Sequence, residues 1–179
     1  MVRQRRAPSA EFAAAYREHV DFVWRVLARR GVAASELEDV TQEVFLVAHR
    51  RWGAWEAGGS MRAWLYGVAR RVAATHHRGR ARRLRKHEAL APASAEPSLD
   101  ARLDDRKRLA ALGEAIAALE ASQREVFVLA EIESMSAPEI AESLGSNLNT
   151  VYSRLRRARA RIARAMADHD EPTSTSGAA

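Results

Sequence analysis

Apolar residues recur at intervals of three and four in one segment of this chain after another. Phe12, Tyr16, Val20, Val23 and Leu27 follow this spacing, which is the spacing of one face of an α-helix. The composition agrees, because 47% of the 179 residues are hydrophobic but only 6% are aromatic. Small aliphatic residues favour helices over the strands of a sandwich or barrel. We therefore expect an all-α protein.

The first half of the chain predicts a bundle of three helices. The first helix runs from Ser9 to about Arg30 and ends near Gly31. Ser35 and Glu38 have the spacing of a capping box that begins the second helix, and Ser60 can cap the third. The apolar faces of the second and third helices then carry Leu37, Val40, Val44, Val47, Trp64, Leu65, Val68 and Val72.

The second half predicts a separate domain of four helices. Residues 88–105 contain two prolines among Ala, Ser and acidic residues without periodicity, which is typical of a flexible linker. Capping boxes at Ser122 with Glu125 and at Ser136 with Glu139 mark two later helix starts. We predict an N-terminal helical bundle over 9–87, a linker over 88–105, a four-helix domain over 106–167 and a disordered tail over 168–179.

The segment from Ser136 to Leu155 has the spacing of a helix-turn-helix, with Gly145 at the turn. In the final helix, expected from Leu148 to Met166, the apolar stripe is Val151, Leu155, Ala158 and Ile162. The side chains left free to enter a DNA major groove are Asn149, Thr150, Tyr152, Ser153, Arg154, Arg156 and Arg157. Arginine can bind guanine through two hydrogen bonds, and serine and tyrosine can bind base edges or phosphates.

The formal net charge of +6 conceals two strongly basic segments, because residues 57–87 and 143–167 contain no acidic side chain. Their basic side chains are Arg62, Arg70, Arg71, Arg78, Arg80, Arg82, Arg83, Arg85 and Lys86 in the first, and Arg154, Arg156, Arg157, Arg159, Arg161 and Arg164 in the second. The rest of the chain is net acidic. Such clusters are typical of contacts with a polyanion, although a solvated face or a membrane-surface helix is the alternative for either cluster alone.

Several classes of protein are disfavoured. The absence of cysteine excludes a disulfide scaffold and thiolate metal sites. No run approaches the roughly 18 apolar residues that span a bilayer, and the basic N-terminus lacks the apolar segment of a signal peptide, so we expect a cytoplasmic protein without a membrane span. A metal-dependent nuclease using His76 and His77 is disfavoured, because neighbouring helical residues point about 100° apart and the sequence has no acidic residue between positions 57 and 87. We expect these histidines to contact a nucleic-acid backbone or to be exposed, and we expect no enzyme activity, cofactor or metal.

Three strings in chain order carry a family resemblance: Leu37-Glu-Asp-Val-Thr-Gln-Glu-Val-Phe-Leu-Val-Ala, then Met61-Arg-Ala-Trp-Leu-Tyr-Gly-Val-Ala-Arg, then Leu119-Glu-Ala-Ser-Gln-Arg-Glu-Val-Phe-Val-Leu leading into Thr150-Val-Tyr-Ser-Arg-Leu-Arg-Arg-Ala-Arg. From about Ala10 to Met166 the chain resembles the extracytoplasmic-function (ECF) sigma factors. These small members of the sigma-70 family of bacterial RNA polymerase sigma factors direct the polymerase to promoters.

The resemblance implies a role for each exposed face. The first domain would bind core RNA polymerase through Asp39, Gln42 and Glu43. It would capture opened minus-ten promoter DNA through the loop 53–60 and the basic helix, with Trp55, Arg70, Arg71, Thr75, His76 and Arg78. The alternative for Trp55 is packing in the core. Arg71 and Thr75 stand where family members often have Asn and Asp, which strengthens the electrostatic contribution to DNA binding.

The resemblance places the second domain on minus-thirty-five DNA, with Tyr152, Ser153 and Arg156 on bases and Thr150, Arg154 and Arg157 on phosphates. It also implies an anti-sigma factor as a partner. A stand-alone helix-turn-helix regulator remains the alternative function. That alternative explains the last third of the chain equally well, but it assigns no role to the acidic second helix or to the glycine-bearing loop.

Overall fold

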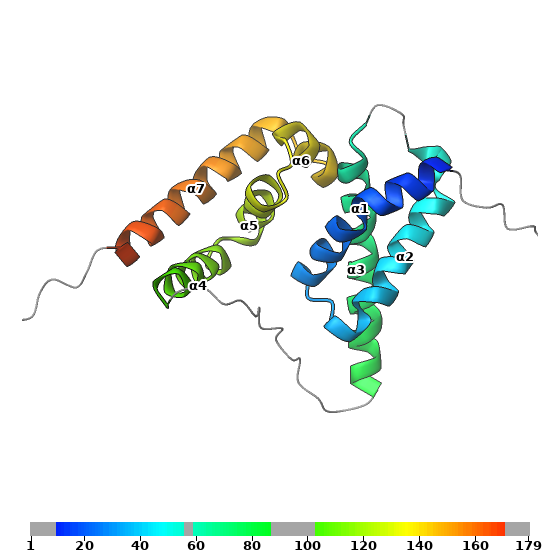
Figure 1. The fold of residues 1–179 in the computed structure, drawn as a ribbon, viewed down its shortest axis with the longest axis horizontal. Coiled ribbons are helices and arrows are strands. Elements are labelled where there is room, and N and C mark those ends of the chain that lie inside the picture. Colours follow the sequence, from blue (N-terminus) through cyan, green and yellow to red (C-terminus); the bar gives the residue numbers. More distant parts are fainter. Residues whose placement is uncertain (1–9, 56–58, 87–102, 171–179) are drawn as a thin grey trace, which may run out of the picture. The chain divides into compact units, whose positions relative to one another are not determined.

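The computed structural model describes residues 10–55, 59–86 and 103–170, and the chain divides into two compact units. The described residues form helices and no β-strand (Figure 1), which confirms the all-α prediction. Most of the predicted linker, 88–105, lies outside the described residues, but helix α4 begins at Leu103, before the predicted linker ends. Helix α7 continues to Asp170, so the predicted tail begins too early. Residues 171–179 lie outside the described part.

Three helices form the first unit: α1 (Ala10–Arg29), α2 (Leu37–Arg50) and α3 (Met61–Lys86). Each packs against the other two, and short 3₁₀ turns, η1 (Ala34–Glu36) and η2 (Trp52–Ala54), follow α1 and α2 (Figure 1). The core side chains include Phe22, Val23, Val26, Leu27, Val40, Val44, Phe45, Leu65, Val68 and Ala69. Full burial of one large aliphatic side chain stabilises the fold by about 1.5–3 kcal/mol.

The buried face of α1 is wider than the predicted stripe. Val23 and Leu27 are buried as expected, and Phe22 and Val26 beside them are buried too. Tyr16 is instead 39% exposed. A helix that packs against two neighbours buries more than one row of side chains, which explains why the buried face of α1 is wider than predicted.

Gly31 ends α1 as predicted. Its φ of +78° is a left-handed conformation that favours glycine. The Gly31 N–H donates to the Ala28 carbonyl at 3.0 Å, and the Val32 N–H donates to the Leu27 carbonyl at 3.2 Å. This pair of bonds is a Schellman motif, which satisfies carbonyl groups at the helix end and turns the chain toward η1.

Of the two caps predicted in the first unit, one is confirmed and one is wrong. The Ala63 N–H donates to Ser60 Oγ at 3.2 Å, so Ser60 caps α3. The capping box predicted at Ser35 with Glu38 is wrong, because Ser35 lies inside η1 and α2 begins after Glu36 with no capping bond from a side chain.

The second unit contains α4 (Leu103–Ala117), α5 (Ala121–Phe127), α7 (Leu148–Asp170) and, through Ala141, α6 (Ala137–Leu144). The four α-helices confirm the predicted four-helix domain, and α4 and α5 both pack against α7. Its buried side chains include Leu119, Val126, Leu129, Ile140, Val151, Leu155, Ala158 and Ile162. The stripe predicted for the last helix, at 151, 155, 158 and 162, is therefore buried as expected.

Of the two capping boxes predicted in the second unit, one is confirmed and one is wrong. The Ser136 hydroxyl and backbone N–H both donate to the Glu139 carboxylate at 2.8 Å. The Glu139 N–H in turn donates to Ser136 Oγ at 3.5 Å. This is the predicted capping box of α6. The box predicted at Ser122 is wrong, because α5 begins at Ala121 and its N-cap is Glu120.

The connection between α5 and α6 was not predicted. Residues 128–132 wind as a π-helix (η3, Val128–Ile132), with the Glu133 N–H donating to the Val128 carbonyl at 3.0 Å. Ser134 then has a φ of +54°, which reverses the chain before α6. An i→i+5 insertion of this kind rotates the side chains that follow it, and no apolar spacing in the sequence signals it.

Candidate polymerase and nucleic-acid interfaces

Three polar side chains form an exposed face on α2. Asp39, Gln42 and Glu43 are all exposed, while Val40 and Val44 on the opposite side are buried. Residues three and four apart on a helix are surface neighbours, so the three polar groups share one side. The face can accept hydrogen bonds from basic groups of a partner and repels phosphate.

Leu46 adds an apolar side chain to this face, and sequence reasoning missed it. Its side chain is 59% exposed, although it lies in a helix whose other large aliphatic residues are at least half-buried. It follows Asp39 by seven residues and Glu43 by three, so it lies on the same side. This spacing was the signal that could have found it. An apolar group beside carboxylates suits a protein partner better than a nucleic acid.

The basic half of α3 presents an exposed row of polar side chains. Arg70, Arg71, Thr75 and Arg78 are all exposed, and the Arg78 guanidinium donates to Thr75 Oγ1 at 3.0 Å. Arg71, Thr75 and Arg78 are separated by four and three residues and therefore form one stripe. No carboxylate of residues 57–87 opposes it, so its charge is available to a phosphate backbone.

His76 and His77 do not belong to this exposed row. His76 Nε2 lies 3.3 Å from a carboxylate oxygen of Glu36, and His77 Nε2 lies 2.8 Å from the Arg30 carbonyl. Both acceptors are oxygens, so each Nε2 carries a proton and donates. Both imidazoles are half-buried against the connection between α1 and α2. Of the two alternatives expected for these histidines, exposure is wrong, because each packs against a partner far away in the sequence. Contact with a nucleic-acid backbone stays a prediction.

An aromatic cluster lies where α1, α2 and η2 meet. The Trp52 ring lies 5.1 Å from Phe12, 5.5 Å from Trp55 and 6.2 Å from Trp64, measured between centroids. Trp55 and Trp64 are half-buried. Trp55 Nε1 is buried and has no hydrogen-bond partner among the described residues. The core-packing alternative for Trp55 therefore fits its surroundings, and only part of its ring is accessible.

The end of α6 and the start of α7 form the turn of a helix-turn-helix. Gly145 has a φ of +61°, and the Ser146 N–H donates to the Ala141 carbonyl at 2.9 Å, which gives a second Schellman ending. Asn147 Oδ1 accepts the Asn149 N–H at 2.8 Å. Asn147 therefore caps α7.

The side chains predicted to face DNA project from the unburied sides of α7. Asn149, Tyr152, Arg156 and Arg157 are exposed, and the exposed fraction of Tyr152 is 53%. The remaining three, Thr150, Ser153 and Arg154, are half-buried. Because positions 151, 155, 158 and 162 are buried, α7 presents these groups over a broad polar face.

Two polar contacts restrict what this face offers. The Ser153 hydroxyl donates to the Thr150 carbonyl at 3.0 Å, so Ser153 presents its oxygen lone pairs to a ligand and withholds its proton. Arg159 binds Glu131 of η3, with Nε and Nη2 at 2.8 and 2.6 Å from the same carboxylate oxygen. Sequence reasoning missed this pair. The Arg159 side chain is 61% exposed, so the pair orients the guanidinium more than it stabilises the fold.

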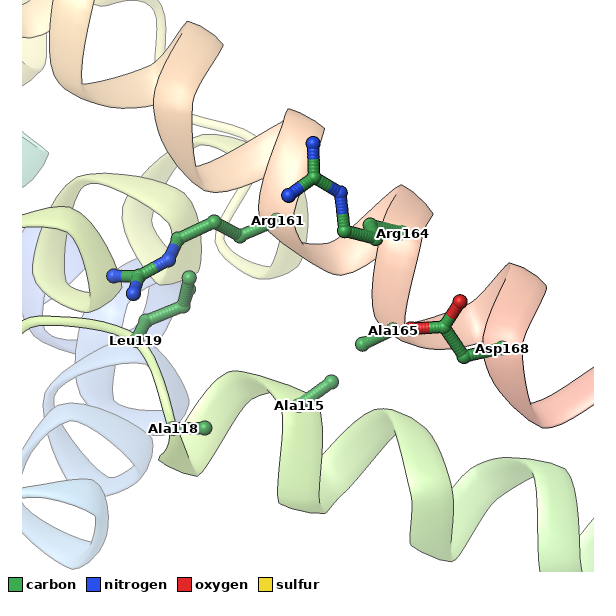
Figure 2. A pocket seen from close by; sticks show the side chains of 7 residues that line it. All are labelled: Ala115, Ala118, Leu119, Arg161, Arg164, Ala165 and Asp168. Carbon is green, nitrogen blue, oxygen red and sulfur yellow. The ribbon is translucent and has the colours of Figure 1, made fainter.

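A hollow of about 240 Å³ lies between α4 and α7 (Figure 2). Ala115, Ala118, Leu119 and Ala165 form its apolar walls, and Arg161, Arg164 and Asp168 of α7 surround it. The lining contains one carboxylate and no nucleophilic side chain.

His19 is a buried titratable group in the first unit, 8% exposed. Burial lowers its pKa from the usual value of 6.5; the Glu18 carboxylate at 3.8 Å partly offsets this, and the Arg62 charge adds to it. The folded state therefore disfavours the protonated imidazole.

Within the described ranges 10–55, 59–86 and 103–170, no group of three or more His, Cys, Asp or Glu side chains could hold a metal ion. In the same ranges, no helix has the length and apolar content needed to cross a membrane.

Comparison with known families identifies the class of protein. Residues 15–83 match the Sigma-70 region 2 family, and residues 109–162 match Sigma-70, region 4. These two regions define a sigma factor, the class of bacterial protein that directs RNA polymerase to promoters. The first match contains the acidic face of α2 and the basic row of α3, and the second contains the polar face of α7.

Individual relatives specify the family. The ECF RNA polymerase sigma factor SigK of Mycobacterium sp. strain KMS is 30% identical, covering 75% of this chain and 69% of SigK. The sigma factor CnrH of Cupriavidus metallidurans is 30% identical, covering 78% of each chain. The chain belongs to the ECF RNA polymerase sigma factors. The ECF sigma factor SigE of Mycolicibacterium smegmatis is 31% identical over 89% of this chain, but the chain spans only 63% of SigE.

Solved structures agree in fold. The sigma factor RpoE of Bartonella quintana, in complex with the anti-sigma factor NepR, has a TM-score of 0.67 and 22% identity, covering 90% of this chain and 99% of that one. CnrH in complex with the cytosolic domain of CnrY has a TM-score of 0.60 and 26% identity, covering 89% of each chain.

Proposed function

We propose that this chain binds core RNA polymerase through the exposed face of α2, formed by Asp39, Gln42 and Glu43. Leu46 extends that face with an apolar contact. A face of two carboxylates, an amide and one aliphatic side chain can bind a basic protein surface that also has apolar groups. This face would repel DNA, so we assign polymerase binding to α2 and DNA binding to the two basic faces.

The basic row of α3 is proposed to hold the opened minus-ten strand. Arg71, Thr75 and Arg78 offer charge and hydrogen bonds along one stripe, and Arg70 adds an exposed charge beside it. Single-strand binding needs a positive groove and stacking rings, and Trp55 at η2 is the proposed stacking residue. His76 belongs to the positioning of α3 more than to the DNA surface, because its Nε2 donates to Glu36.

The polar face of α7 is proposed to lie in the major groove of minus-thirty-five DNA. Tyr152, Ser153 and Arg156 would contact bases, and Thr150, Arg154 and Arg157 would contact phosphates. The exposure of Tyr152 and Arg156 and the buried stripe opposite them support this orientation. The corresponding domains are 9–87 and 106–167, the second extended to begin at Leu103 and to end at Asp170.

One observation carries the proposal most directly. The chain keeps acidic and basic side chains on separate exposed helix faces, each opposite a buried apolar stripe. A protein that contacted DNA alone would have no use for the acidic face. A sigma factor requires both kinds of surface, because it must bind polymerase and promoter at once.

The test is transcription by purified core polymerase from a pool of genomic fragments, with and without this chain. We expect defined transcripts from a small set of fragments only when both components are present. Tight duplex binding by the chain alone, with no transcript from any fragment, would support a stand-alone regulator instead.

We further propose an anti-sigma factor as a partner and the cytoplasm, where core polymerase acts, as the working compartment. The neighbours RpoE and CnrH, solved in complex with NepR and the cytosolic domain of CnrY, support the first. No chemistry is assigned to the chain itself, since the role is that of a specificity subunit. Reversing the charges of Asp39 and Glu43 tests whether such a partner covers the polymerase-binding face.

A further inference from the structure

The connection between α1 and α2 makes three polar contacts with the basic half of α3. His77 Nε2 donates to the Arg30 carbonyl at 2.8 Å. Arg80 Nη1 donates to Glu36 Oε2 at 2.8 Å, and His76 Nε2 lies 3.3 Å from the same oxygen. We call residues 30–36 the bracket, since both of its ends bind α3.

These contacts lie where the apolar core of the first unit ends. Val72 and Ala73 are the last buried side chains of α3 among the described residues, and none from 74 to 82 is buried. A helix that leaves its core depends on other contacts for a fixed direction, because exposed helical turns fray. The bracket supplies such contacts over the turn of α3 that contains Thr75 and Arg78.

Gly31 shapes the bracket. Its φ of +78° turns the chain so that the Arg30 carbonyl faces His77. A Cβ placed on Gly31 would lie 4.0 Å from the Cε1 atom of His77, so the imidazole rests against the turn. The histidine therefore contacts the turn and donates a hydrogen bond to it.

Glu36 fixes the other end. Its side chain is 33% exposed, as is that of Arg80, while that of His76 is 12% exposed. His76 and Arg80 are four residues apart and lie on one side of α3. Thr75 and Arg78 are exposed on other sides of the same turns. The Glu36 carboxylate thus holds His76 and Arg80 on one side of α3. This fixes the rotation of α3 about its own axis, and with it the direction of the exposed groups.

We propose that Glu36 and His77 are positioning residues for promoter opening. They hold the basic half of α3 in the direction that aligns Arg71, Thr75 and Arg78 with the opened strand, and they do not touch DNA themselves. This inference rests on the proposed binding of minus-ten DNA by α3. Its consequence is that a change in the bracket reduces promoter opening without reducing polymerase binding.

The test uses the full chain assembled with core polymerase on a template recovered in the transcription assay above. Glu36→Gln keeps the size of the side chain and removes its charge. Glu38→Gln is the matched control, because Glu38 is exposed and lies two residues from Glu36. Its replacement by Gln changes the net charge by the same amount. The measurements are thermal unfolding, the affinity for core polymerase, and permanganate reactivity of thymines in the opened region.

We expect Glu36→Gln to reduce promoter opening about tenfold, the ratio that corresponds to the net contribution of one charge-assisted hydrogen bond. Polymerase affinity should stay within twofold, and Glu38→Gln should open the promoter like the unchanged chain. His77→Ala should show the same selective loss. His77→Gln, whose amide can donate to the Arg30 carbonyl, should recover most of it.

Several results would overturn the inference. Equal opening by Glu36→Gln and Glu38→Gln, or no difference between His77→Ala and His77→Gln, would show that the bracket does not position α3. Stronger DNA binding by Glu36→Gln with a steeper salt dependence would mean that Glu36 withholds Arg80 from phosphate instead. Normal opening by Arg71→Ala and Arg78→Ala variants would refute the proposed role of α3 itself, and the inference with it.

Discussion

Arg156 and Arg157 are neighbours on α7, and both are exposed, but the account gives them different tasks. Arg156 follows Tyr152 by four residues and shares its side of the helix, so it is placed on a base. Arg157 points about 100° away and is placed on a phosphate. Replacing each by alanine should therefore have different effects on affinity, salt dependence and sequence preference.

The magnitudes follow from the chemistry of each contact. Loss of a bidentate arginine–guanine contact costs about 1–3 kcal/mol at one base pair and leaves other sequences nearly unaffected. Loss of one phosphate contact reduces the slope of log K against log salt by about 0.9. Between 50 and 200 mM salt, the unchanged chain should therefore lose about 3.5-fold more affinity than the variant that lacks the phosphate contact.

The assay is binding of holoenzyme to promoter duplexes with each substitution at the minus-thirty-five element, over that salt range. Arg156→Ala should lose discrimination at one position and keep most of the salt slope. Arg157→Ala should weaken binding to every duplex alike and flatten the slope. If both variants lose affinity uniformly, the assignment of the reading face of α7 is refuted.

Three further predictions concern the other faces and the fold. The double change Asp39→Lys and Glu43→Lys should abolish binding to core polymerase and leave thermal unfolding unchanged, because both side chains are exposed. Ser136→Ala should lower the free energy of unfolding by about 1 kcal/mol, while Ser122→Ala, outside any formed capping box, should have a much smaller effect in the same denaturant titration. Because the pKa of His19 is lowered in the folded state, the unfolded chain binds more protons below pH 6.5. The free energy of unfolding should therefore fall as pH drops from 6.5 toward the folded pKa, by at most about 1.4 kcal/mol per pH unit. His19→Gln should remove that dependence in unfolding curves measured against pH.

The helix ends show what the sequence can predict locally. Gly31, Gly145 and Ser136 each have a requirement met within a few residues, a positive φ or a reciprocal capping bond, so their roles were predictable. Ser122 has the same local pattern but lies one residue inside its helix. The helix begins earlier there, at Ala121, and Arg124 donates to the carbonyl groups of Ile116 in α4 and of Leu119 beyond it.

The candidate site divides in the same way. Exposure of Asp39 and Arg156 follows from the three- and four-residue spacing of apolar side chains, and the structure agrees with it. The partner of His76 lies 40 residues away in the sequence, and no local pattern reveals it. Long-range contacts of this kind set the direction of α3, whereas periodicity sets which of its sides is exposed.

The proposed function requires that this chain give core polymerase the ability to start transcription at particular sites. The position and amount of transcript made by purified core polymerase on one recovered template, with and without the chain, test this requirement. We expect a transcript with a single start site that requires the chain and disappears with the Asp39→Lys, Glu43→Lys variant. Tight binding of the chain to the same template without any transcript, or equal transcription by the double variant, would contradict it.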